Sequence, residues 1–186
     1  TRLLAAYGGR GPVWVNSAAG GGPGLATAIA LMRHADEDGL HPEDYQADEL
    51  ATSASSFGRA TPEASALEAT HERARQAARL DIEMTQAFSR FLRHLHRGHA
   101  NPREVGFQVT LPADEHDYAA VAIRAAREGN VATLKESLEP PLVQYRLLRS
   151  ELPRFRALAA REGRDLPALG APPRKSLRPG DRAAGL

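Results

Sequence analysis

Apolar residues along this chain recur mostly at intervals of three or four positions, which is the spacing of one face of a helix. Residues 25–35 follow this spacing, and Gly39 stands where a left-handed C-terminal cap belongs. Pro42 suits the first position of a new short helix with acids in its first turn. Residues 8–15 predict a turn with a short extended piece, and residues 51–62 predict a loop of small residues.

The longest predicted helix begins at Pro62, after the capping residue Thr61, and ends at Arg97. No glycine or proline interrupts it after Pro62, and Gly98 follows its end. One of its faces carries charged side chains, so the other face is expected to be buried. The buried face is predicted to consist of Ala77, Leu80, Met84, Phe88, Phe91, Leu92 and Leu95.

Three further helices are predicted in the remaining chain. Residues 114–129 predict a helix with acids in its first turn, and residues 130–138 predict a short helix capped by Asn130. A last helix, from about residue 142 to 162, should be kinked at Pro153 because proline removes a backbone hydrogen bond. Its inward face is predicted from helical spacing to be Leu142, Tyr145, Leu148, Leu152 and Phe155.

These patterns predict an all-α fold, an irregular multi-helix domain organised around one long helix. The aromatic content of 5% is low, so the core must be built from leucine, alanine, valine and isoleucine, which suits closely packed helices. We expect the helical domain to span residues 1–166, followed by a proline-rich linker at 167–176. Residues 177–186 would begin a further module.

Composition narrows the chemistry. The chain has no cysteine, which excludes disulfides, thiolate metal sites and a cysteine nucleophile within it. Its net charge of +1 combines −5 over residues 1–141 with +6 over residues 142–186. The basic C-terminal third is therefore expected to face either a polyanion or the acidic remainder of the same chain.

The exposed basic residues of the last helix, Arg146, Arg149, Arg154 and Arg156, form the candidate interaction surface. Two interpretations remain open: a solvated face of a structural helix, or a surface that binds an anionic polymer. No nucleic-acid partner is expected, because the pI is near 8.2 and no nucleic-acid-binding motif is present.

No catalytic, cofactor or metal site is predicted. His94, His96 and His99 cluster near the end of the long helix, but positions two apart do not share a helical face, so we expect solvent-facing cations there. A stand-alone hydrolase is a third hypothesis. It requires a deep pocket with two facing carboxylates, one of them in apolar surroundings.

Several segments together resemble the N-terminal scaffold region of the large periplasmic L,D-transpeptidases, the YcbB-like branch. The segments are LLAAYGGRGPVWV, the helix ending in DGLHPEDY, DIEMTQAFSRFLRHLHRGHANP, LEPPLVQYRLLRSELPRFR and LRPGDR. They occur in the order that this family uses and cover nearly the whole chain. The double proline before QYRLLR, and LRPGDR after a proline-rich linker, are the most specific.

The resemblance implies a periplasmic protein that takes part in peptidoglycan 3–3 cross-linking. In that family a peptidoglycan-binding module and a catalytic domain with an essential cysteine follow the scaffold, and LRPGDR would begin the binding module. The family's catalytic signature, a histidine and a Ser-His-Gly-Cys segment, matches no position here. This chain alone is therefore expected to be non-catalytic, with peptidoglycan or the adjacent domains as its partners.

Overall fold

The computed structural model describes residues 6–9, 11–16, 20–57, 66–100, 102–104, 106, 108 and 113–162. Several sequence predictions lie outside these residues. They are the capped start of the long helix at Thr61 and Pro62, the linker at 167–176 and the module expected at 177–186.

Within the described residues the fold is all-α, as predicted. A single antiparallel pairing of two-residue strands, β1 (Val15–Asn16) with β2 (Gly20–Gly21), is the one exception in this part of the chain. The helices and 3₁₀ helices are α2 (Leu25–Arg33), η1 (Ala35–Asp38), η2 (Pro42–Tyr45), α3 (Ala47–Ser56), α4 (Ala66–Arg97), α5 (Tyr118–Glu128), α6 (Val131–Leu138) and α7 (Val143–Glu162).

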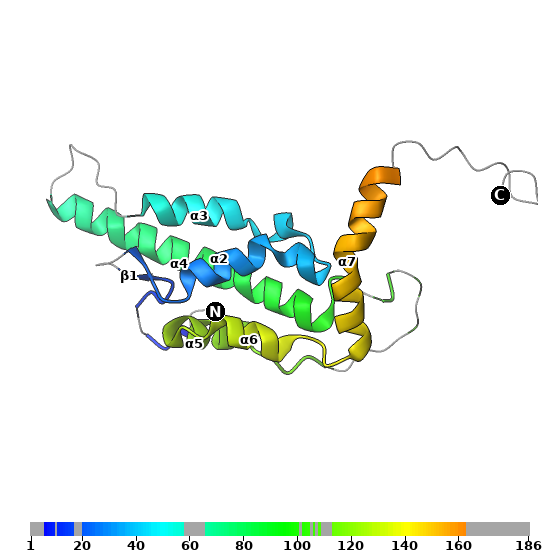
Figure 1. Ribbon diagram of the computed structural model, residues 1–186. Coiled ribbons are helices and arrows are strands. Elements are labelled where there is room, and N and C mark those ends of the chain that lie inside the picture. The colour runs from blue at the N-terminus through cyan, green and yellow to red at the C-terminus, as the bar shows by residue number, and fades with distance from the viewer. Residues whose placement is uncertain are drawn as a thin grey trace, which may run out of the picture. The chain divides into compact units, whose positions relative to one another are not determined.

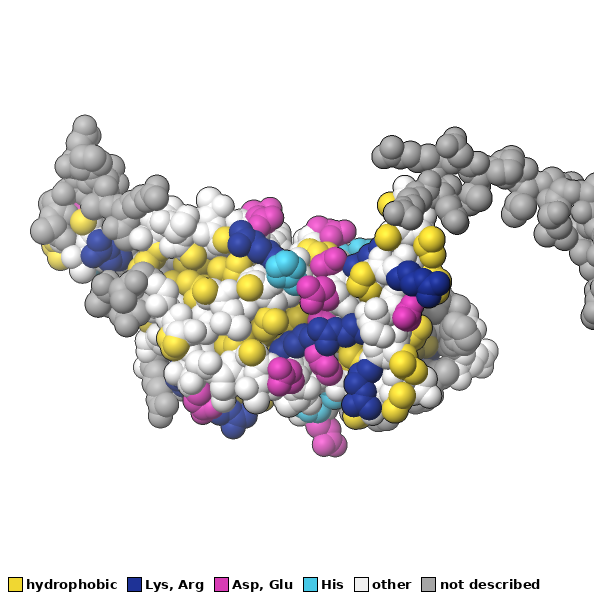
Figure 2. All heavy atoms as spheres, in the orientation of Figure 1, with side chains coloured by type: hydrophobic (Ala, Val, Ile, Leu, Met, Phe, Trp, Pro, Cys, Tyr) yellow, Lys and Arg dark blue, Asp and Glu magenta, His cyan; other side chains and the backbone are white. Residues whose placement is uncertain are grey.

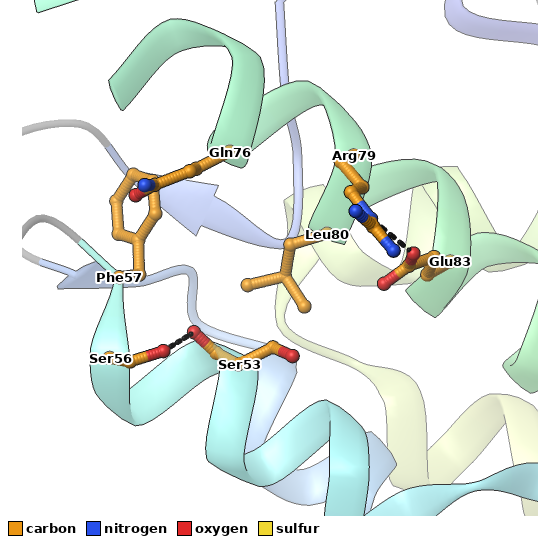
Figure 3. Close-up of a pocket in the computed structure, with 7 residues that line it drawn as sticks. All are labelled: Ser53, Ser56, Phe57, Gln76, Arg79, Leu80 and Glu83. Atoms are coloured by element: carbon orange, nitrogen blue, oxygen red, sulfur yellow. Dashed lines mark hydrogen bonds and ion pairs between the residues drawn. The ribbon is translucent and has the colours of Figure 1, made fainter. Parts of the chain in front are cut away.

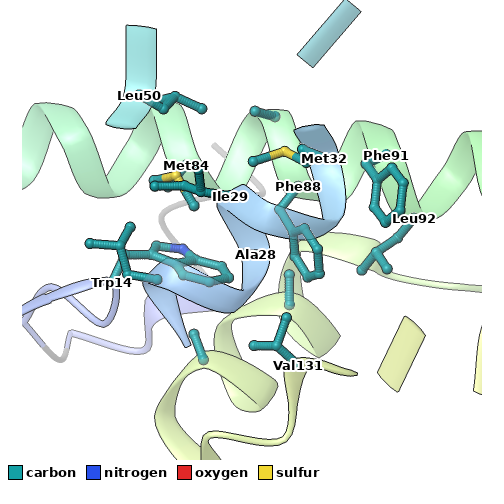
Figure 4. Close-up of a cluster of buried hydrophobic side chains, with 14 of the residues drawn as sticks. Trp14, Ala28, Ile29, Met32, Leu50, Met84, Phe88, Phe91, Leu92 and Val131 are labelled. Carbon is teal, nitrogen blue, oxygen red and sulfur yellow. The ribbon is translucent and has the colours of Figure 1, made fainter. Parts of the chain in front are cut away.

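Helix α4 is the axis of the helical body. Helix α3 packs along one side of it and α5 and α6 along the other, while α2 lies between them in contact with α3, α4 and α6 (Figure 1). The apolar face predicted for this helix is confirmed, because all seven of its residues are buried. Phe88 and Phe91 stack on each other with ring centroids 5.8 Å apart, and the rings of Trp14 and Phe88 meet in a T-shaped contact (Figure 4).

The start of α2 passes very close to the junction of α5 and α6. A Cβ atom on Gly24 would lie 2.7 Å from a methyl carbon of Val131 and 3.0 Å from the Cα of Ala126. A glycine is therefore required here by the close approach of two backbones, since any side chain would push the helices apart.

A buried carboxylate on α4 holds the N-terminal segment. Asp81, 1% exposed, accepts hydrogen bonds from the backbone N–H groups of Val13 at 2.7 Å and Trp14 at 2.6 Å. Its other oxygen accepts one from the hydroxyl of Tyr7. The Trp14 indole N–H donates to Thr85 Oγ1, one turn along the helix, at 2.8 Å. These bonds satisfy the buried charge.

The apolar spacing predicted for residues 25–35 is confirmed, since Leu25, Ala28, Ile29, Met32 and Ala35 are all buried. The helix is nevertheless not continuous. It ends at Arg33, and η1 leads to the left-handed cap Gly39, with φ of 76°.

The loop predicted at 51–62 is wrong for its first part, because α3 continues through Ser56. Small serine and threonine side chains bond back to carbonyls within this helix, as Thr52 does to Asp48 at 2.9 Å. Such residues favour loops only weakly, and packing against α4 overrides that preference.

One predicted helix start and one predicted capping bond are corrected. Helix α5 begins at Tyr118 rather than at residue 114, and Asp117 caps it by accepting from the Ala120 N–H at 3.0 Å. Asn130 does occupy the cap position of α6, but its side chain makes no capping bond and donates to Glu128 instead. Gly129 ends α5, and it takes the left-handed conformation.

The chain divides into two compact units, Thr1–Arg149 and Ser150–Leu186. Helix α7 continues through Pro153.

Replacing Phe88, which is fully buried, with alanine is expected to lower the free energy of unfolding by about 3–5 kcal/mol, because it leaves a cavity beside Trp14 and Phe91. Urea denaturation followed by circular dichroism measures the change. The matched control is Leu67→Ala on the same helix, where the side chain is 67% exposed and the loss should stay within about 0.5 kcal/mol. Equal losses in both variants would show that the buried face is misassigned.

Candidate functional site

The candidate arginines of α7 have different environments. Arg146 and Arg156 are exposed, and Arg154 is exposed and pairs with Glu151 at 3.2 Å. Arg149 is partly buried, and its guanidinium lies 3.0 Å from Asp38 and 3.1 Å from Glu139. The basic C-terminal third was predicted to face either a polyanion or the acidic remainder of the chain. Arg149 faces the acidic remainder of the chain.

Arg149 belongs to a group of four charged side chains and one tyrosine that we call the Asp38 cluster: Asp38, Lys135, Glu139, Arg149 and Tyr145. The Lys135 ammonium lies 3.0 Å from Asp38 and also pairs with Glu139. The side chains of Asp38 and Lys135 are only 3% and 7% exposed, so this pair is shielded from water. The cluster joins η1, α6 and α7, three elements that are distant in sequence.

Tyr145 completes the cluster from α7. Its hydroxyl donates to Asp38 at 2.8 Å, and its ring packs against the apolar core. Burial, followed by the hydrogen bond to Asp38, raises the pKa of Tyr145 well above its ordinary value. The phenol therefore remains protonated and acts as a hydrogen-bond donor to the carboxylate at physiological pH.

The Asp38 cluster balances its charges internally. Two carboxylates, Asp38 and Glu139, face two cations, Lys135 and Arg149. Because each buried charge has a partner within the cluster, the arrangement needs no ligand to neutralise it. Its evident role is to fasten the first turns of α7 to the helical body.

The predicted inward leucine face of α7 is wrong for most of its members. Tyr145 does pack inward, but its neighbours do not, because the face toward the body is set by Tyr145 and Arg149, one turn apart. Hydrophobic side chains are accordingly visible on the surface over α7 (Figure 2). The exposed ones are Leu142, Val143, Leu147, Leu148, Phe155 and Leu158.

The three clustered histidines are not all solvent-facing cations, which corrects the prediction. His96 is partly buried, and its Nδ1 lies 3.0 Å from the carbonyl oxygen of Leu138. His94 is also partly buried, with Nδ1 3.0 Å from the Tyr45 hydroxyl, and its pKa is lowered by burial and by the nearby His99. His99 is exposed and lies 3.2 Å from Asp44.

A groove of about 540 Å³ runs between α3 and α4 (Figure 3). Its carboxylate, Glu83, is 38% exposed and pairs with Arg79 at 2.8 Å, while Ser56 bonds to the Ser53 carbonyl. A hydrolytic general acid needs a carboxyl in apolar surroundings facing a second carboxylate. This groove supplies neither condition, so it does not support the hydrolase hypothesis.

Residues 2–152 match the family model described as Scaffold domain. The chain belongs to this family. No curated protein and no solved structure matches the chain.

The Scaffold domain match contains every residue of the Asp38 cluster and reaches into α7. Its end at residue 152 falls close to the boundary of the first compact unit at Arg149. The anchored start of α7 is thus part of this Scaffold domain. Among its described helices none combines the length and apolar character needed to cross a bilayer.

Sequence reasoning missed the Asp38 cluster. The one local signal was the pair Lys135 and Glu139, four residues apart on a helix, which is a spacing that brings opposite charges together. Asp38 is 97 positions from Lys135, and nothing in the sequence indicates that they meet.

Lys135→Met is expected to lower the free energy of unfolding by about 3 kcal/mol, since it removes one of the two cations that pair with the buried Asp38. Tyr145→Phe should cost about 1–2 kcal/mol through the lost hydrogen bond. Arg154→Met removes an exposed ion pair and should cost less than about 1 kcal/mol. Chemical denaturation of the three variants in parallel tests this order, and a Lys135 variant as stable as the Arg154 variant would contradict it.

Proposed function

We propose that this chain is the non-catalytic scaffold portion of an L,D-transpeptidase-like protein that acts in peptidoglycan 3–3 cross-linking in the periplasm. Membership of the Scaffold domain family supports the general role. The finer assignment is supported by the ordered segments that resemble the large L,D-transpeptidases. The absence of cysteine from the sequence means that a thioacyl intermediate cannot form on this chain.

The observation that carries the proposal is that the buried charges pair with one another rather than facing a cavity. The Asp38 cluster consists of charges that neutralise one another and hold α7, with Asp38 only 3% exposed. Catalytic charges are instead directed at a cavity where a substrate can reach them. A body that fixes the start of a helix and leaves that helix's apolar side chains uncovered is suited to holding other parts of a protein in place.

The partners that fit this role are the peptidoglycan-binding and catalytic domains of the same protein. Exposed leucine and valine side chains at the start of α7, Leu142, Val143, Leu147 and Leu148, offer an apolar surface of the kind that domain contacts bury. Peptidoglycan itself is the second partner in this proposal.

Deleting the gene that encodes this chain should reduce the 3–3 linked dimers in the cell wall of the organism that carries it. Muramidase digestion of purified sacculi, followed by chromatography and mass spectrometry, measures them. A gene copy carrying Arg154→Met should restore the dimers fully, whereas one carrying Lys135→Met should restore fewer because α7 loses its anchor.

The isolated chain should form no 3–3 bond when incubated with tetrapeptide-containing peptidoglycan fragments. Either turnover by this chain unaided or an unchanged content of 3–3 dimers in the deletion strain would contradict the proposal.

The alternative function is a binding module whose basic residues hold an anionic polymer. The exposure of Arg146, Arg154 and Arg156 favours it. We expect a scaffold to bind purified sacculi equally well with and without these three side chains changed to alanine. Arg149 must be left intact, because its removal would disturb the Asp38 cluster as well as the surface charge.

The charge-matched control for that sedimentation assay changes Arg73, Arg75 and Arg79 of α4 to alanine, which are also exposed. Loss of most sacculus binding in the α7 triple variant, with normal binding by the α4 variant, would favour the polymer-binding function over the scaffold.

A further inference from the structure

Three side chains with metal-ligating atoms converge beside the C-terminal end of α4. Asp44 comes from η2, His94 from α4 and His99 from the turn that follows it. One ligating atom from each lies within 4.8 Å of the other two. The group does not overlap the Asp38 cluster, and the proposed scaffold function makes no use of it.

The turn after α4 brings the two histidines together. Gly98 has a φ of 86°, which a glycine adopts readily, and it reverses the chain so that His99 returns toward the helix. The two imidazole rings meet edge to face, with centroids 4.8 Å apart. This pairing cannot be read from helical spacing, because His99 lies beyond the end of the helix.

Asp44 is contributed by η2, which is held against α4. Arg90 donates to its backbone carbonyl at 2.9 Å, which fixes η2 against α4. Its Oδ2 atom is buried, and no described residue donates a hydrogen bond to it. That oxygen lies 3.2 Å from His99 Nε2 without hydrogen-bond alignment. The ligand atoms of four-coordinate zinc stand about 3.3 Å apart, given bonds of about 2.0–2.2 Å.

His94 has the second contact that a metal-bound histidine usually makes. Its Nδ1 lies 3.0 Å from the hydroxyl of Tyr45, which leaves Nε2 as the ligating nitrogen. Tyr45 is itself fully buried, and its ring packs edge to face on Phe91 at 5.4 Å. The orientation of the His94 ring is therefore set by a rigid neighbour.

We propose that Asp44, His94 and His99 form a binding site for a divalent transition metal of the zinc class. Two imidazole nitrogens and one carboxylate oxygen are a donor set that zinc accepts, with the fourth position open to water or an incoming ligand. Calcium and magnesium are disfavoured because they select oxygen ligands.

One cation competes with the metal. The guanidinium of Arg93 lies 3.4 Å from His94 Nε2, and this exposed side chain must turn away for a metal to bind. Arg90 adds positive charge nearby and is held by its bond to Asp44. Both reduce the affinity, so removing the charge of Arg93 should strengthen binding.

The test is titration of the purified, metal-free chain with Zn²⁺ alone, measured by isothermal calorimetry. Binding of one Zn²⁺ is expected. Asp44→Asn, His94→Gln and His99→Ala should each weaken it by at least about tenfold, and Tyr45→Phe by about tenfold through loss of the supporting hydrogen bond. Arg93→Gln should bind more tightly than the natural chain.

The matched control is His96→Ala, which removes a neighbouring histidine that points elsewhere, toward Leu138. It should leave zinc binding unchanged. Co²⁺ provides a second readout, because a tetrahedral site gives intense visible absorption that the His99→Ala variant should lack. His99 is exposed, so this variant should remain folded, as circular dichroism would verify.

Equal Zn²⁺ affinity in the natural chain and His99→Ala, or an equal loss in His96→Ala, would overturn the assignment. Neither result would affect the scaffold function, which is tested through 3–3 cross-links and does not depend on the metal.

Discussion

The fold depends on the burial of one face of α4. Each large apolar side chain on that face contributes about 1.5–3 kcal/mol on leaving water, and the phenylalanines Phe88 and Phe91 are fully buried. Five other elements are arranged by what they can cover on this face: α3 from one side, α5 and α6 from the other, α2 between them, and β1, which Trp14 precedes, at one end. The buried Asp81 on the same helix also fixes the position of the N-terminal segment. Its carboxylate accepts hydrogen bonds from the backbone N–H groups of Val13 and Trp14, and these bonds form only when that segment lies in one place.

Helix α7 is attached by a different kind of interaction. The Asp38 cluster joins it to the body through charged and hydroxyl groups, and four of its five members carry formal charges that cancel. Apolar attachment tolerates sliding, because dispersion contacts are not directional. A carboxylate that is bonded at once to an ammonium, a guanidinium and a phenol accepts one geometry only. The orientation of the first turns of α7 is therefore defined more sharply than a leucine contact would define it.

The sequence predicted what helical spacing controls and missed what tertiary contacts decide. All seven residues of the α4 face and the glycine cap at Gly39 follow from local pattern alone. The spacing on α7 correctly indicated a helix, but it did not show which face would be buried. The face with Tyr145 and Arg149 packs inward because both side chains bond to Asp38, which lies more than a hundred positions before Tyr145 in the chain. The convergence of His94 with His99 required the turn at Gly98, and that with Asp44 required the placement of η2. Helix periodicity contains neither piece of information.

The polar attachment of α7 has a thermodynamic consequence. Separation of this helix from the body would expose ion pairs and one tyrosine ring, and little additional apolar surface, because its leucines near the junction are already in contact with water. Heat-capacity changes scale with the apolar area exposed. The free energy of releasing the first turns of α7 should therefore vary almost linearly with temperature, without the curvature that apolar burial produces. It should remain sensitive to ionic strength through the partly exposed Arg149 and Glu139. Cooling, which weakens apolar contacts, would therefore not by itself loosen the first turns of α7.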